Sequence, residues 1–119
     1  CACEHEPVLL VGYDTEAHGL LADVNTSRGL LGVALVLSPV RGPASLGTLR
    51  WQLEDGAGAA PALRSVVSQG LQANAMSDAL PLFESLVLDD SHALALPLPG
   101  ARHLALRHHH VQPVQSSTP

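Results

Sequence analysis

The sequence predicts a single all-β domain, built as a small β-sandwich or jelly-roll. The chain has 119 residues, of which 46% are hydrophobic and 14% are charged, so it is long enough to bury one core but too short for two ordinary domains. Short apolar segments separated by turn residues are typical of sandwiches and small barrels, whereas βαβ arrays need longer helical stretches. We expect a β-rich domain over residues 1–114 and a polar tail over residues 115–119.

Residues 48–54 give the clearest strand signal, because apolar and polar side chains alternate there with a period of two. The turn sequence Asp55-Gly56-Ala57-Gly58 follows and predicts the end of the strand. Alternation places the apolar side chains on one face. The side chains expected to be buried are Leu49, Trp51 and Leu53, and those expected to be exposed are Arg50 and Gln52.

Two further regions have strand patterns. Leucines alternate over residues 94–98 and again over 104–106, with Pro99-Gly100 between them, which predicts a β-hairpin. Residues 7–12 and 30–37 are continuous apolar runs of strand length, which favours strands covered on both faces at the centre of the fold.

The middle third, residues 59–88, has the weakest pattern. We predict two more strands there, because Gly70 and Pro81 interrupt any long helix. The alternative is an α+β domain in which the middle third forms one helix across a sheet. A short helix is a further expectation for residues 15–23. The side chains that would mark a helical face in the middle third are Leu63, Val66, Val67, Leu71 and Ala75.

Charge and hydropathy exclude two classes of partner. The net charge is −5, and the six basic residues, all arginine, are scattered between Arg28 and Arg107, so we expect no binding to nucleic acid. The longest apolar run, residues 30–37, is far shorter than the roughly 20 residues needed to cross a bilayer, so we expect no membrane span.

Histidine and cysteine clusters at the two ends of the chain are candidate metal sites. On a strand, His108 and His110 point to one face and His109 to the other, so at most two of the three converge, with His103 or His92 as the only nearby helpers. The segment Cys1-Ala2-Cys3-Glu4-His5 offers two thiols and an imidazole, but no fourth ligand is evident. We therefore expect no metal and no other cofactor.

Catalytic patterns are also incomplete. Cys1 has the form of an N-terminal nucleophile, but no motif supplies an oxyanion hole. Three processes would make Cys1 the first residue, and the sequence does not distinguish them: removal of Met, cleavage of a signal peptide and lipoprotein maturation. Asp89-Asp90-Ser91-His92 contains the residue types of a hydrolytic triad, but immediate neighbours seldom converge as a triad, so a turn is the better interpretation. We expect that the protein is not an enzyme and has no catalytic residues.

Two segments resemble the small capsid cement, or decoration, proteins of tailed bacteriophages. They are Gly47-Thr48-Leu49-Arg50-Trp51-Gln52-Leu53-Glu54-Asp55-Gly56 and Leu94-Ala95-Leu96-Pro97-Leu98-Pro99-Gly100-Ala101-Arg102-His103-Leu104-Ala105-Leu106-Arg107. In that family an alternating strand leads to a turn, and a Leu-Pro-Gly-Arg hairpin precedes the last strand. The aromatic residue often found near the start of that strand is replaced here by His103-Leu104. The resemblance implies a sandwich or jelly-roll that oligomerises, often as a trimer, and clamps capsid subunits without catalysis.

These observations favour a structural assembly protein, most concretely a capsid cement protein located in the virion. Its expected partners are capsid subunits or other copies of itself. The chain has no Lys and few charges with which to protect the edges of its sheets from association. The alternative is an exported or lipid-anchored β-sandwich, extracellular or at the cell surface, that binds a protein or carbohydrate. With one Trp, one Tyr and one Phe, the chain has few aromatic faces for stacking on sugars.

Overall fold

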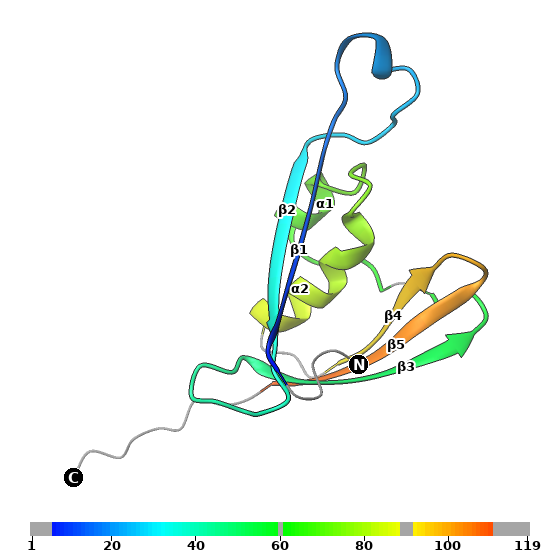
Figure 1. Ribbon diagram of the computed structural model, residues 1–119. Coiled ribbons are helices and arrows are strands. Elements are labelled where there is room, and N and C mark those ends of the chain that lie inside the picture. The colour runs from blue at the N-terminus through cyan, green and yellow to red at the C-terminus, as the bar shows by residue number, and fades with distance from the viewer. Residues whose placement is uncertain (1–5, 60, 89–91, 111–119) are drawn as a thin grey trace.

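The computed structural model describes residues 6–59, 61–88 and 92–110. Five strands form two antiparallel sheets, with helices between them in the chain (Figure 1). The protein is therefore predominantly β, as predicted. The elements in order are β1 (Val8–Thr15), η2 (Gly19–Leu21), β2 (Leu30–Leu37), β3 (Gly47–Asp55), α1 (Val66–Gly70), η3 (Ser77–Ala79), α2 (Leu80–Val87), β4 (His92–Leu98) and β5 (Arg102–His110).

The two sheets differ in size and connection. β1 and β2 form a two-stranded hairpin in which Val8 pairs with Leu37 and Thr15 with Leu30. The second sheet has the order β3-β5-β4, and β4 and β5 form the hairpin predicted from the alternating leucines. Gly100 makes its turn with a φ of 80°, a backbone conformation that glycine adopts without strain. The predicted end of β3 is confirmed, because the strand ends at Asp55 and the chain bends at Gly56, which has a φ of 97°.

The middle third is helical, so the prediction of two strands there is wrong. The alternative, which placed one helix in this region, is correct in that the region is helical, but the described residues there form two short α-helices. Ser65 caps α1 by accepting a hydrogen bond from the backbone N–H of Ser68. Pro81 lies in the first turn of α2, where its missing N–H costs no helical hydrogen bond. It therefore starts the second helix instead of interrupting one. The short helix expected within residues 15–23 is the single turn η2.

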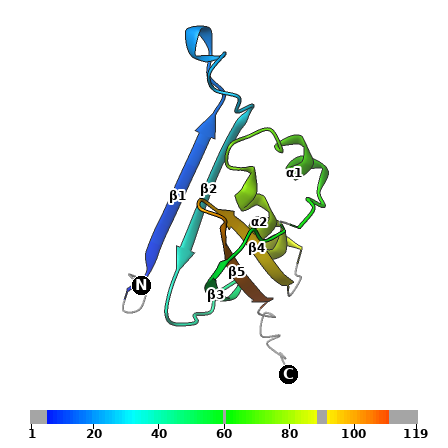
Figure 2. The ribbon, with the colours of Figure 1, turned by 90° about the vertical axis from the view of Figure 1, so that its right-hand side faces the viewer.

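α2 packs against β4 and β5 and lies in the angle between the two sheets (Figures 1 and 2). The centre of the core is formed by Leu82 of α2, Leu94 of β4 and Leu106 of β5. Leu35 of β2 packs against this cluster and so connects the hairpin to the core. The remaining hydrophobic side chains around the cluster are Leu49, Leu86, Leu96 and Leu104.

The burial predicted for β3 is only partly correct. Leu49 packs against the core, and Arg50 and Gln52 are exposed as expected. However, Trp51 is 56% exposed and Leu53 is also exposed. The reason is position: β3 is an edge strand, and α2 covers β4 and β5 instead.

The continuous apolar runs do form strands, β1 and β2, but they are not central. Helices cover part of one face of this hairpin, where Leu10 is still 57% exposed, and the other face is exposed along its length. The molecule measures 63 × 34 × 28 Å with a radius of gyration of 16.6 Å, compared with about 13.5 Å for a compact domain of this length. The hairpin and the loop at its end account for the length (Figure 1).

Three sequence predictions fall outside the described residues: the thiol and imidazole cluster at residues 1–5, the turn at residues 89–91, and the polar tail at residues 115–119. Within the described part of the chain, no helix is both long enough and apolar enough to cross a membrane.

Candidate interaction surface

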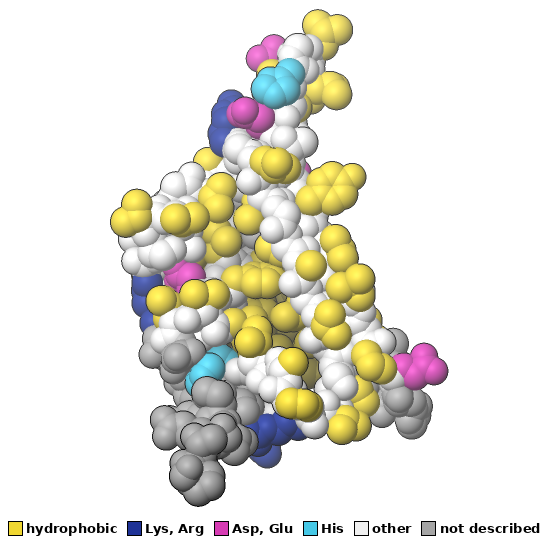
Figure 3. Space-filling view, turned by 90° about the vertical axis from the view of Figure 1, so that its left-hand side faces the viewer, with side chains coloured by type: hydrophobic (Ala, Val, Ile, Leu, Met, Phe, Trp, Pro, Cys, Tyr) yellow, Lys and Arg dark blue, Asp and Glu magenta, His cyan; other side chains and the backbone are white. Residues whose placement is uncertain are grey.

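The exposed side of the β1–β2 hairpin, called the outer face below, is an uncovered apolar surface. Its five large hydrophobic side chains are each between 64% and 77% exposed. Figure 3 shows hydrophobic side chains along the hairpin, with few charged groups among them. The residues of the outer face are Leu9, Val11, Tyr13 and Thr15 on β1 and Leu30, Gly32, Ala34 and Val36 on β2.

Contiguous apolar surfaces of this kind usually mark sites of interaction in proteins. Single exposed hydrophobic residues are normal, and the largest apolar patch on a monomer, typically about 300–600 Å², is often a functional surface. The outer face extends over two strands of eight residues each, so it is about 26 Å long. Its only polar side-chain groups are the hydroxyls of Tyr13 and Thr15.

The edge of the hairpin is also open. β1 lies at the outer margin of the molecule, with β2 between it and the helices (Figure 2). Natural proteins usually protect such an edge with charges, proline or a bulge. Here β1 contains one charged residue, Asp14, and β2 contains none.

A buried polar clasp fixes the distal end of the hairpin to the helical part of the molecule. The side-chain amide of Asn74, which is buried, donates to the carbonyl oxygens of Arg28 at 3.1 Å and Gly29 at 3.2 Å. The backbone N–H of Arg28 donates in return to the carbonyl of Ala73 at 3.0 Å. These contacts hold the opposite, inner face of the hairpin against the helices. The outer face is therefore directed away from the helices.

A second set of contacts strengthens this clasp. The Ser27 hydroxyl donates to the Asp14 carboxylate and accepts a hydrogen bond from the N–H of Ala75 at 2.9 Å. Nearby, a Cβ placed on Gly12 would lie 2.7 Å from the methyl carbon of Met76, so the absence of a side chain at residue 12 lets Met76 pack on the hairpin.

Further exposed hydrophobic side chains lie away from the outer face, among them one group on the loop between β1 and β2 and another on β3. The loop between β1 and β2 carries Leu20, which is 97% exposed, together with the exposed Leu21 and Val24. β3 carries Trp51 and Leu53. The loop is at one end of the long axis, so the molecule offers apolar contacts at more than one position (Figure 1).

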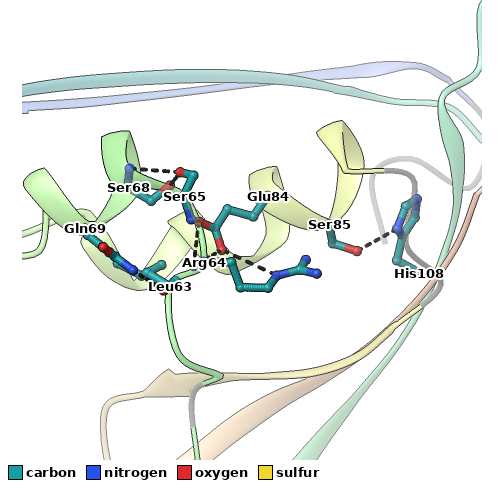
Figure 4. A network of polar contacts seen from close by, with 8 residues as sticks. All are labelled: Leu63, Arg64, Ser65, Ser68, Gln69, Glu84, Ser85 and His108. Carbon is teal, nitrogen blue, oxygen red and sulfur yellow. Dashed lines mark hydrogen bonds and ion pairs between the residues drawn. The ribbon is translucent and has the colours of Figure 1, made fainter.

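The main polar network inside the protein is centred on Glu84 of α2 (Figure 4). Both carboxylate oxygens accept from the backbone N–H of Arg64 at 3.0 Å, and one accepts from the N–H of Ser65 at 2.8 Å. Burial disfavours the charged form, but these bonds and those from the hydroxyls of Ser68 and Ser65 hold the pKa of Glu84 below its usual value. The ionised carboxylate thereby anchors the start of α1 to α2.

Ser85 and His108 form a second buried polar contact in the core (Figure 4). The Ser85 hydroxyl lies 2.8 Å from Nδ1 of His108, and both residues are 0% exposed. A serine–histidine contact resembles part of a hydrolytic site, but a nucleophile must reach its substrate. Because both side chains are fully enclosed, we interpret this contact as structural.

The remaining histidines have the orientation predicted for a strand. His108 and His110 lie on the same face, with ring centroids 6.3 Å apart, and His109 is exposed. His103 is separate from them, with Nε2 3.1 Å from a carboxylate oxygen of Glu54. Among residues 6–59, 61–88 and 92–110, no three His, Cys, Asp or Glu side chains are close enough to hold a metal ion.

A small pocket lies beside Glu84. Its volume is about 90 Å³, whereas pockets for organic ligands usually measure about 300–1,000 Å³. The pocket is therefore too small for an ordinary metabolite. Its lining residues are Pro61, Ala62, Arg64, Pro81, Glu84 and Leu94.

Sequence reasoning missed Asn74, Glu84 and Ser85. Glu84 and Ser85 are adjacent polar residues inside an apolar helical segment, and that interruption was the available signal. Nothing in the sequence around Asn74 indicates that its amide reaches backbone carbonyls some 45 residues earlier in the chain.

Comparisons with known proteins give no further assignment. No protein-family model matches the chain, and no curated protein or solved structure matches it significantly.

Proposed function

We propose that this chain is a non-enzymatic assembly protein that binds other proteins through uncovered apolar surfaces. The observation that carries the proposal is the outer face, whose large side chains are exposed along the whole hairpin. Interfaces of permanent complexes are apolar and resemble a core cut in half. Such a surface suits a chain that stays bound to its partner.

The most concrete form of this proposal is a capsid cement, or decoration, protein of a tailed bacteriophage, located in the virion. The resemblance that suggests it involves two segments, residues 47–56 and 94–107. These segments lie in a single sheet, in which β5 pairs with both β3 and β4. Their adjacency supports applying the resemblance to one folded unit.

The buried polar groups also favour a non-catalytic role. Ser85 and His108 are enclosed by the core, and the carboxylate of Glu84 is used in anchoring α1. Each of these groups already has a structural task. Among the described residues, the exposed apolar surfaces have no such structural role.

Within this proposal, the protein forms a homo-oligomer and a partner completes the β-sandwich or jelly-roll. The β1–β2 hairpin has helices on one side only, so a further sheet packed on the outer face would give two stacked sheets. Capsid subunits would contact the remaining apolar surfaces, including the loop that carries Leu20.

The proposal is tested by purifying virus-like particles from the organism that encodes this chain. An antibody against the chain should detect it in the particle fraction of a density gradient. Cryo-electron microscopy should then show it on the outer shell at a fixed ratio to the capsid subunit. A chain found only in fractions without particles would overturn the capsid cement proposal.

A further inference from the structure

The outer face has an asymmetry of size across its two strands. In the cross-strand pairs of its centre, Tyr13 lies opposite Gly32 and Val11 lies opposite Ala34. The larger side chain is on β1 in both pairs and the smaller residue is on β2. The centre of the face therefore has a ridge along β1 and a groove along β2.

We propose that the outer face binds the outer face of a second copy, forming a dimer whose two-fold axis runs parallel to the strands. The proposal rests on the assembly role above and specifies the surface and the partner. This rotation places β1 of each copy over β2 of the other without shifting the cross-strand pairs. Tyr13 then lies over Gly32 of the partner subunit, and Val11 over Ala34 of the partner subunit.

A two-fold axis that lies in the plane between the two faces but runs perpendicular to the strands gives poorer packing. It would place β1 over β1, so that Tyr13 meets Val11 of the partner subunit. Gly32 would then meet Ala34 of the partner subunit, which leaves a space with no side chain to fill it. Protein interfaces pack as densely as protein interiors, so the arrangement that fits ridges into grooves is favoured.

The area of the face is close to the lower limit for a biological interface. A large apolar side chain removes roughly 100 Å² from water when it is fully buried. The five side chains are between 64% and 77% exposed, so the four aliphatic ones give roughly 65 Å² each and the larger Tyr13 gives roughly 150 Å², which is about 400 Å² for each copy and about 800 Å² for the pair. This approaches the roughly 1,000 Å² expected of a biological interface. The exposed edges of Ala34 and Thr15 would add to this area.

Charge and symmetry also favour a second copy as the partner. The face carries no charged side chain, so stacking two identical faces brings no like charges together. Two-fold contacts between identical surfaces are the commonest form of protein oligomer. Two hairpins stacked in this way form an aligned sandwich about 10 Å thick.

The substitution Gly32→Val tests the proposal with the full-length chain. A Cβ at residue 32 would have its nearest heavy atom 3.9 Å away, at Cβ of Tyr13, so the monomer has room for it, and valine favours strands. In the dimer, however, it occupies the groove that receives Tyr13 of the partner subunit. The matched control is Gly70→Val on α1, where an added Cβ meets nothing within 4 Å.

Sedimentation velocity over a range of concentrations measures the result. We expect the wild type and Gly70→Val to be dimers, and Gly32→Val to dissociate at least tenfold more readily. Circular dichroism verifies that each variant is folded. If Gly32→Val does not fold, Tyr13→Lys serves in its place, because residue 13 is exposed in the monomer and an ammonium group would be buried in the dimer.

A compensating pair of substitutions tests the register of the contact. Tyr13→Ala removes the ridge and should weaken the dimer. Combining it with Gly32→Val moves the bulk from β1 to β2, so the double variant should dimerise more tightly than Gly32→Val alone. A double variant no tighter than Gly32→Val would overturn the proposed register.

The possible outcomes separate this inference from the proposed function. A wild-type monomer at every concentration, or a trimer, would overturn the dimer; if that protein still decorates shells, the assembly role stands and the outer face belongs to a capsid subunit. A dimer that binds no particle would overturn the capsid cement proposal and leave the dimer in place. A monomer that associates only with phospholipid vesicles would overturn both.

Discussion

The substitution Glu84→Gln should destabilise the protein in a way that depends on pH. Glutamine keeps one oxygen as an acceptor but turns an amide N–H toward the backbone donors of Arg64 and Ser65, which lie 3.0 and 2.8 Å from the carboxylate, respectively. Hydrogen bonds to a charged group contribute about 1.5–3 kcal/mol each. Losing one of them and opposing a donor with a donor should lower the free energy of unfolding by about 2–4 kcal/mol near neutral pH.

The direction of the pH dependence follows from the lowered pKa of Glu84. Because the pKa is lower in the folded protein than in the unfolded chain, the carboxylate stabilises the fold fully above the unfolded-state value of about 4.3. That stabilisation is lost as the pH falls through the lower folded-state value. The difference in stability between the wild type and Glu84→Gln should therefore be largest near neutral pH and should narrow in acid.

Urea denaturation followed by circular dichroism, at fixed protein concentration and several pH values, measures this difference. The control is Glu54→Gln, because Glu54 is exposed and its contact with His103 should contribute no more than about 1 kcal/mol. Equal losses for the two variants, or a Glu84→Gln loss that stays constant from neutral to acid pH, would refute the anchoring role of Glu84.

Four other substitutions test the packing, each by urea denaturation. Asn74→Ala should cost about 2 kcal/mol, because it removes the amide that holds the hairpin carbonyls; a loss below about 0.5 kcal/mol would contradict the clasp. Gly47→Ala should cost about 1–3 kcal/mol, since its Cβ would clash with Nε2 of His108 and would lie 2.7 Å from the backbone oxygen of His109. Gly12→Ala should cost less, because its Cβ would meet only the flexible end of a methionine, and the reverse order would count against this packing. Trp51→Ala should cost under about 1 kcal/mol, far below the roughly 3–5 kcal/mol of a core tryptophan, and a blue-shifted indole emission in the wild type would argue against its exposure.

The strands of the second sheet were predictable because their signals are local. Alternation over residues 48–54 and the turn at Pro99-Gly100 determine β3, β4 and β5 from neighbouring residues alone. Burial was less predictable. Trp51 has the alternation of a core residue, but its exposure depends on which strands α2 covers, and that is a property of the tertiary structure.

The helices of the middle third were missed because Pro81 was treated as a breaker. Proline prevents helical bonding in the interior of a helix but not in its first turn, and the sequence does not reveal which position it has. The apolar runs at residues 7–12 and 30–37 were misplaced for a related reason. A strand buried on both faces and a strand that keeps one apolar face exposed have the same sequence pattern.

The sequence therefore showed the candidate surface only as two apolar runs, without indicating that one face of each strand is exposed. The strand register was needed to show that Tyr13 and Gly32 lie opposite each other with no helix over them. In the same way, the polar residues of the core acquire their partners only through the fold, because Ser85 meets His108 from a different element.

An isotope-filtered nuclear Overhauser experiment tests the central claim most directly. Labelled and unlabelled chains are mixed, so that only contacts between two copies are detected, and the cross-strand contact between Tyr13 and Gly32 within one hairpin is filtered out. Stacked outer faces predict intermolecular contacts between the ring protons of Tyr13 and the Cα protons of Gly32. Intermolecular contacts confined to other parts of the molecule, or no intermolecular contacts at concentrations well above those used for sedimentation, would contradict assembly through the outer face.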